Sequence, residues 1–158
     1  GCLYFGLMIT ADGPKVIEYN CRFGDPETQV VLPLLKSDLL TVMRSVTDEN
    51  LAETDVEFYD ACACCIIMAS KGYPQSYEKG FEITIPEDIS ENVFAAGVKK
   101  EDGKLLTSGG RVLGVTAVAE KLSDAVENAY GMVKRIHFEN SYCRSDIGKK
   151  ALGALEDK

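Results

Sequence analysis

The sequence predicts an α+β fold in two parts: an amino-terminal part with strands and short helices, and a larger β-rich part that ends in helices. Two observations carry this prediction. Short apolar runs rich in β-branched and aromatic residues recur along the chain between turn-forming segments. A helical repeat of apolar residues is clearest near the carboxyl end, in residues 123–136. Short, regularly spaced strands are typical of a small β-barrel or sandwich, which we expect for the larger part.

The composition is that of a soluble globular protein. The 158 residues suffice for one ordinary domain or two small ones, and 46% of them are hydrophobic. The net charge of -8 argues against a nucleic-acid partner, whose phosphates it would repel. No apolar run approaches the roughly 20 residues that cross a bilayer, so we expect no membrane span. The apolar start, residues 1–13, has no basic leader, so we read it as a strand rather than a signal peptide.

The six cysteines do not form a metal-binding or disulfide pattern. Cys62 and Cys65 make a single C-x-x-C without a second pair, so we expect reduced, mostly buried thiols in a cytoplasmic protein. Cys21 is a weak candidate for a nucleophile. Histidine occurs once, at His137, which gives little support to a hydrolase triad.

The amino-terminal part begins with two predicted strands, 3–10 and 15–20, joined by a hairpin turn at 11–14. A short helix interrupted at Pro33 and a second helix from about Asp38 to Val46 follow. The polar segment 47–55 is the best candidate boundary, so we expect domains at 1–55 and 56–158.

The second part is predicted to contain several strands and to end in two helices. The first helix can be capped by Ser123 and carries an apolar stripe through Ile136, and the second covers about 145–155. The predicted strands are 57–68, 81–85, 92–99, 104–107 and 111–119.

Polar side chains gather at the end of the second predicted strand. Glu18 and Asn20 are two residues apart and therefore point to one face, and Arg22 follows if the strand continues. A carboxylate and an amide offer the hard oxygens that Mg²⁺ prefers beside phosphates. Asp25 and Pro26 then suit an N-cap and a first helical position. The alternative is a solvated strand and a capped helix without a ligand.

A second candidate site is the loop 107–111, Thr-Ser-Gly-Gly-Arg. Gly109 and Gly110 would let backbone amides approach an anion, and Arg111 could contact phosphate with two nitrogens. The alternative is a glycine-rich connection with a surface arginine. Lys71 and Lys79 are weaker candidates, because lysines in loops are usually solvated.

Several blocks together resemble the glycinamide ribonucleotide synthetases (phosphoribosylamine-glycine ligases) of the ATP-grasp superfamily. The central block is EYNCRFGDPETQVVLPLLKSDLL, beginning at Glu18. Further blocks are LYFGLMIT at 3–10, ASKGYP at 69–74, SGGRVLGVTA at 108–117 and YCRSDIG at 142–148. They keep the family's order and cover nearly the whole chain. The resemblance implies the carboxy-terminal part of an ATP-grasp domain, followed by the synthetase's carboxy-terminal β-rich domain.

The resemblance also implies an activity and roles for the site residues. The family joins glycine to 5-phosphoribosylamine through glycyl phosphate, with ATP as co-substrate, in purine biosynthesis. Glu18 and Asn20 would bind Mg²⁺ or Mn²⁺, Arg22 would be the catalytic residue beside the transferred phosphoryl group, and Asp25 would bind glycine's ammonium. Gly109, Gly110 and Arg111 would bind the ribose-phosphate.

The family's amino-terminal half does not align with this sequence, so we expect these residues alone to be inactive. A longer polypeptide that contains them could be multifunctional. Residues 3–10 also lack the acidic metal ligand that many ATP-grasp enzymes carry there, and Phe94–Val98 replaces a histidine-containing segment.

Two alternatives remain open at the level of sequence. Another ATP-grasp carboxylate-amine ligase or carboxylase would share the Glu-x-Asn-x-Arg pattern of residues 18–22 but not the other blocks. A non-enzymatic barrel-sandwich module, such as a carrier domain, would present a modified lysine at a hairpin. Lys100 and Lys104 lie near a turn but lack flanking methionines.

Overall fold

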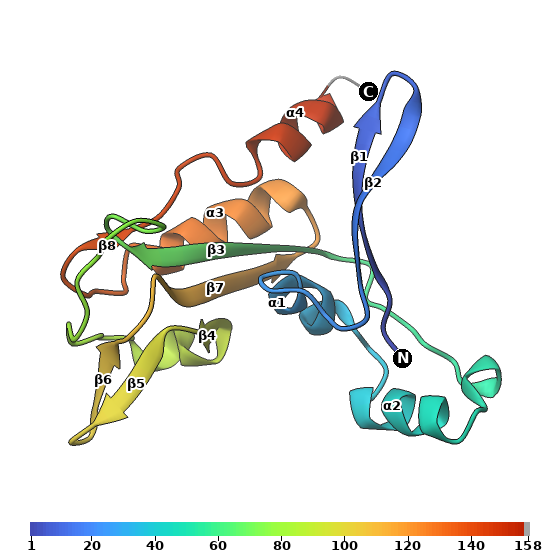
Figure 1. The fold of residues 1–158 in the computed structure, drawn as a ribbon, viewed down its shortest axis with the longest axis horizontal. Helices are drawn as coiled ribbons and strands as arrows, with labels where there is room; N and C mark the ends of the chain where they lie inside the picture. Colours follow the sequence, from blue (N-terminus) through green and yellow to red (C-terminus); the bar gives the residue numbers. More distant parts are fainter. Residues whose placement is uncertain (157–158) are drawn as a thin grey trace. The chain divides into compact units, whose positions relative to one another are not determined.

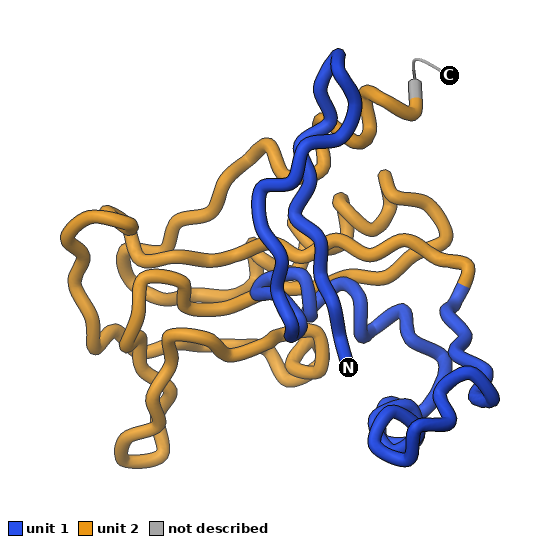
Figure 2. The backbone as a smooth tube through the Cα atoms, turned by 45° about the vertical axis from the view of Figure 1, so that its right-hand side comes forward, with its two compact units in different colours: residues 1–59 blue, residues 60–158 orange. Residues whose placement is uncertain are grey.

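The structure, a computed structural model, describes residues 1–156. The chain divides into two compact units, one spanning residues 1–59 and the other beginning at Asp60 (Figure 2). The domain boundary predicted after Asp55 lies just before this division. Strands and helices occur in both units, so the predicted α+β class is confirmed.

The first unit begins with the predicted β-hairpin (Figure 1). Strands β1 (Tyr4–Thr10) and β2 (Gly13–Asn20) pair antiparallel around Ala11 and Asp12. Gly13 has a φ of 92°, which favours glycine at this turn. The sheet contains only these two strands, and most large apolar side chains of this region are exposed: Leu3, Phe5, Leu7, Met8, Ile9, Val16, Ile17 and Tyr19.

Two short helices and two 3-10 turns complete the first unit. They are α1 (Thr28–Val31), η1 (Leu32–Leu34), α2 (Leu39–Thr47) and η2 (Leu51–Glu53). Helix α2 begins where the sequence predicted a helix, and Asp38 caps it: its carboxylate accepts hydrogen bonds from the Thr41 backbone amide at 2.7 Å and hydroxyl at 2.8 Å.

The predicted N-cap role of Asp25 is wrong. The chain makes a turn after Gly24, whose carbonyl accepts a hydrogen bond from the Thr28 amide at 3.0 Å, so α1 begins only at Thr28. The Asp25 carboxylate instead accepts a hydrogen bond from the Gln29 side-chain amide at 3.1 Å. The residue at the N-cap position is Glu27, which makes no side-chain capping bond.

The second unit is built on a four-stranded antiparallel sheet in the order β4-β7-β3-β8 (Figure 1). Its long central strands, β3 (Cys62–Ser70) and β7 (Arg111–Ala119), pair with each other. The short strands β4 (Val93–Ala95) and β8 (Ser141–Tyr142) flank them. Strand β3 starts later than predicted because Phe58 pairs with Leu35 in the first unit.

The helix α3 (Leu122–Val133) packs on β3 and β7 and closes the core. Ile66 and Val115 of the sheet are fully buried, and so are Ala125 and Ala129 of the helix, as the predicted stripe requires. The predicted cap at Ser123 is wrong, because the helix already begins at Leu122 and the Ser123 hydroxyl bonds to the Asp124 carboxylate at 3.0 Å.

The predicted strands 81–85 and 92–99 are not continuous in the structure, and the described residues form no closed barrel. Segment 81–85 makes only single bridges, because Glu82 pairs with Leu106 while Thr84 pairs with His137. The predicted strand 92–99 is divided between β4 and β5 (Val98–Glu101), and β5 pairs with β6 (Lys104–Thr107). The turn η3 (Glu87–Asn92) precedes β4, and α4 (Lys149–Glu156) begins after Gly148, whose φ is 83°.

Candidate functional site

Glu18 and Asn20 lie on one face of β2, as the strand alternation predicted. The register pairs Asn20 with Tyr4 and Glu18 with Gly6, without an irregularity between these pairs. Glu18 crosses the space above Gly6, because a Cβ atom at that position would lie 2.9 Å from Glu18 Cγ. A carboxylate and an amide oxygen donor therefore share the end of the hairpin.

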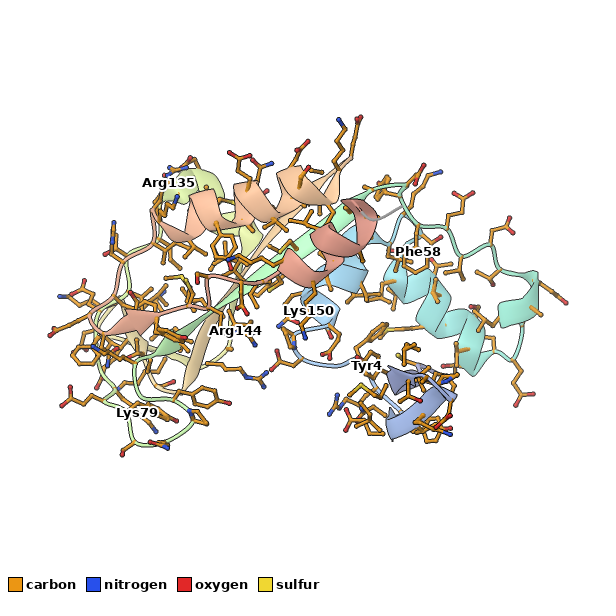
Figure 3. The ribbon with its side chains drawn as sticks, turned by 90° about the horizontal axis from the view of Figure 1, so that it is seen from above. Tyr4, Phe58, Lys79, Arg135, Arg144 and Lys150 are labelled. Atoms are coloured by element: carbon orange, nitrogen blue, oxygen red, sulfur yellow. The ribbon has the colours of Figure 1, made fainter. Side chains whose placement is uncertain are left out.

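Tyr4 and Glu27 join this face, although the sequence did not single them out. The Tyr4 hydroxyl (Figure 3) donates a hydrogen bond to Glu27 Oε1 at 3.2 Å. This bond and the negative charge of Glu27 raise the pKa of Tyr4, and burial and the charge of Glu18 raise it further. The Tyr4 hydroxyl is thus bonded to Glu27, a residue 23 positions further along the chain.

Arg22 does not share the strand alternation. Strand β2 ends at Asn20, and Arg22 is exposed, with its Nη1 donating to the Phe23 carbonyl at 3.1 Å. The condition for placing Arg22 on the same face, that the strand continues, is therefore not met. Asp25 is also exposed and is bonded to Gln29 as described above.

The 107–111 loop of the second unit is held closely by its neighbours. The amides of Ser108 and Gly109 donate to the Gly97 carbonyl at 2.7 and 3.1 Å, and the Gly97 amide donates to the Arg111 carbonyl at 2.8 Å. The Gly109 amide therefore already has a hydrogen-bond partner within the protein. Arg111 begins β7 with a half-buried side chain, and Gly110 is buried.

Tyr73 covers Gly110 from the neighbouring 71–80 loop. A Cβ atom on Gly110 would lie 2.8 Å from Tyr73 Cγ, so only glycine leaves room for the ring. The Tyr73 ring meets Tyr77 edge-on at 6.0 Å between centroids, and Lys79 Nζ lies 5.5 Å from the Tyr77 centroid. Lys79, labelled in Figure 3, therefore lies next to the aromatic pair Tyr73–Tyr77, which borders Gly110.

The cysteines differ from the prediction in burial. All six are free, but only Cys64 is buried, and Cys21 is exposed. Desolvation raises the pKa of the Cys64 thiol, so this cysteine is a poor nucleophile.

The described part of the chain lacks both a cluster of typical metal-binding side chains and a membrane-spanning helix. Within residues 1–156, no three His, Cys, Asp or Glu side chains gather in a group that could hold a metal ion. A cation at Glu18 would therefore need amide and ligand oxygens as well. No helix within the same residues has the length and apolarity to cross a membrane.

Comparisons with known families give two matches along the chain. Residues 1–28 match the ATP-grasp (A) domain of phosphoribosylglycinamide synthetase, and residues 63–150 match its C domain. Along the chain, the match to the ATP-grasp domain thus precedes the match to the C domain. It belongs to the phosphoribosylglycinamide synthetase family.

Individual relatives agree with this family. The chain is 50% identical to the phosphoribosylamine-glycine ligase of Clostridium acetobutylicum over 94% of its own length and 36% of the relative. It is 50% identical to the trifunctional purine biosynthetic protein adenosine-3 of Gallus gallus over 98% of its own length and 16% of the relative. The crystal structure of phosphoribosylamine-glycine ligase from Thermotoga maritima superposes with a TM-score of 0.75 at 38% identity, covering 92% of this chain and 36% of that one. The chain therefore spans about a third or less of the length of these relatives.

Proposed function

We propose that the chain supplies the end of the ATP-grasp domain and the carboxy-terminal domain of a phosphoribosylamine-glycine ligase. This enzyme of purine biosynthesis joins glycine to 5-phosphoribosylamine through glycyl phosphate and releases glycinamide ribonucleotide, ADP and phosphate. The observation that carries the proposal is the order of the two family matches, residues 1–28 and then 63–150. The C-domain match favours this reaction over other ATP-grasp ligases, carboxylases and carrier modules.

Glu18 and Asn20 are the residues that we assign to Mg²⁺ or Mn²⁺. Their hard oxygens on one face fit such a cation, and the missing side chain at Gly6 leaves room for the carboxylate. When bound, the cation offsets the repulsion between glycine's carboxylate and the triphosphate of ATP.

Arg22 and Asp25 are assigned to the reacting ends of the two substrates. The exposed guanidinium of Arg22 would stabilise negative charge on the transferred phosphoryl group. The exposed carboxylate of Asp25, two residues before Glu27, would accept hydrogen bonds from glycine's ammonium.

The second unit would hold the ribose-phosphate of 5-phosphoribosylamine. Because the Gly109 amide is already bonded to Gly97, we assign the direct phosphate contacts to Arg111 and the Gly110 amide. Gly109 would contribute by letting the backbones approach closely. A Cβ atom on Gly109 would lie 2.9 Å from Gly97 Cα.

We expect the complete reaction to require more chain than the matched 36% of the ligases, and to take place in the cytoplasm. The 158 residues alone should therefore release no glycine-dependent phosphate.

The test uses a full-length ligase that carries this sequence. Phosphate release is followed with ATP, glycine and freshly generated 5-phosphoribosylamine at several Mg²⁺ concentrations, for wild type, Glu18→Gln and Asn20→Ala. We expect turnover to depend on glycine and to fall at least about 100-fold in both variants while the circular dichroism spectrum is unchanged. Turnover that survives both changes would remove these residues from the cation site, and wild-type turnover without glycine would refute the ligase assignment.

A further inference from the structure

Glu27 contacts the face of the hairpin that carries Glu18 and Asn20. Its Oε1 accepts a hydrogen bond from the Tyr4 hydroxyl at 3.2 Å. Tyr4 pairs with Asn20 across the hairpin, and Glu18 pairs with Gly6. Directly paired residues share a face, and so do residues two apart on one strand, so Tyr4, Glu18 and Asn20 lie on the same face. The Tyr4–Glu27 bond thus connects a residue distant in sequence to the face that carries Glu18 and Asn20.

Each of the two glutamate side chains occupies space that a glycine leaves open. Glu18 lies over Gly6, as described above. Glu27 folds back over Gly24, where a Cβ atom would lie 2.8 Å from Glu27 Cδ and still closer to one of its oxygens. Both acidic side chains are therefore directed by the absence of a side chain beneath them.

Neither carboxylate has a cationic partner within residues 1–156. Ion pairs of the described residues involve other acidic side chains, and the nearby Arg22 bonds to a backbone carbonyl. Glu27 stands at the N-cap position of α1 but makes no capping bond, so its carboxylate is not used to begin the helix. A divalent cation would offset two like charges held on one face.

We propose that Glu27 completes the oxygen-donor set of the cation site of Glu18 and Asn20, and that Tyr4 is the positioning residue that orients Glu27. This inference rests on the proposed function for the presence of the cation. The role of Tyr4 is that of a neighbour that fixes a ligand through a hydrogen bond, and losing such a neighbour typically lowers metal affinity about 10- to 100-fold.

The experiment measures Mn²⁺ binding to the full-length ligase without substrates, by the electron paramagnetic resonance signal of free Mn²⁺. We expect Glu18→Gln and Glu27→Gln each to raise the Kd about 10-fold or more. Tyr4→Phe should raise it less, and adding it to Glu27→Gln should raise it no further, because Tyr4 acts on the cation only by orienting the charged carboxylate that Glu27→Gln already removes.

Gly24→Ala tests the position of the carboxylate without removing any charge. Its methyl group would displace the Glu27 carboxylate, so the Kd for Mn²⁺ should rise as in Glu27→Gln. Gly131→Ala is the matched control, because nothing lies within 4 Å of a Cβ atom there, and its Kd should equal that of wild type.

The outcomes separate this inference from the proposed function. If Glu18→Gln weakens Mn²⁺ binding while Glu27→Gln and Gly24→Ala do not, Glu27 is no part of the site and only the inference fails. If Glu18→Gln also has no effect, or the wild type binds no Mn²⁺, the cation site itself is refuted. If the circular dichroism spectrum shows that Glu27→Gln does not fold, the Mn²⁺ affinities of Gly24→Ala and Tyr4→Phe decide whether Glu27 belongs to the cation site.

Discussion

Gly97 illustrates how a single residue without a side chain shapes the second unit. Its carbonyl accepts hydrogen bonds from the amides of Ser108 and Gly109, and its amide reaches the Arg111 carbonyl. A Cβ atom on Gly97 would lie 2.6 Å from Gly109 Cα and 2.8 Å from its nitrogen. Such contacts are with backbone, which cannot move aside as a side chain does.

We therefore expect Gly97→Ala to destabilise the second unit by about 1–3 kcal/mol, the usual range for forced overpacking. Urea unfolding followed by circular dichroism checks this. Gly131→Ala in α3 adds the same methyl group in open space and should leave the midpoint equal or higher. Equal stability of Gly97→Ala and wild type would show that the 97–109 contact relaxes without cost.

At the scale of elements, α2 depends on the cap that Asp38 provides at its first turn. Asp38 precedes the apolar positions of the helix, and its carboxylate bonds the Thr41 amide and hydroxyl. These bonds lower the pKa of Asp38 in the folded state. The cap therefore stabilises α2 fully above the pKa that Asp38 has in the unfolded chain. This stabilisation is lost as the pH falls through the lower pKa of Asp38 in the folded protein.

Asp38→Ala should accordingly speed amide hydrogen exchange in α2 at neutral pH, and the difference from wild type should shrink in acid. Asp48→Ala is the matched control at the other end of the same helix, where a carboxylate does not favour the helix dipole. If Asp48→Ala exposed α2 to exchange as strongly as Asp38→Ala, the capping explanation would be wrong.

The sequence predicted those features that depend on neighbours in the chain. Strand alternation placed Glu18 and Asn20 together, and turn-forming residues located the hairpin. It did not predict Tyr4 with Glu27, because their hydrogen bond joins residues 23 positions apart. The strands predicted at 81–85 and 92–99 are too long, because partners distant in sequence interrupt them. Phe81–Ile85 alternates between two partners, and Gly97 turns the chain towards Arg111.

At the scale of the whole molecule, the two units differ in how much apolar surface each buries. The second unit has a core of fully buried residues, including Ile66, Val112 and Val115. The first unit has a two-stranded sheet whose side chains remain mostly exposed, with Ile9 at 77% and Ile17 at 63%. A two-stranded sheet without a covering layer is marginally stable in water.

In the isolated 158-residue chain we expect amides of β1 and β2 to exchange at least about 10-fold faster than those of β3 and β7. Hydrogen exchange read by mass spectrometry of peptides from each strand measures the difference. Similar protection in both sheets would mean that the first unit gains stability from interactions that its own contacts do not supply.

The glycines beneath the two carboxylates also bear on how inherited variants of this segment are interpreted. Gly6 and Gly24 carry no functional group, yet each leaves the space into which Glu18 or Glu27 extends. An alanine allele at either position would remove no acid, base or ligand. With the cation site proposed above, such an allele would nevertheless lose cation affinity as an allele at the glutamate does.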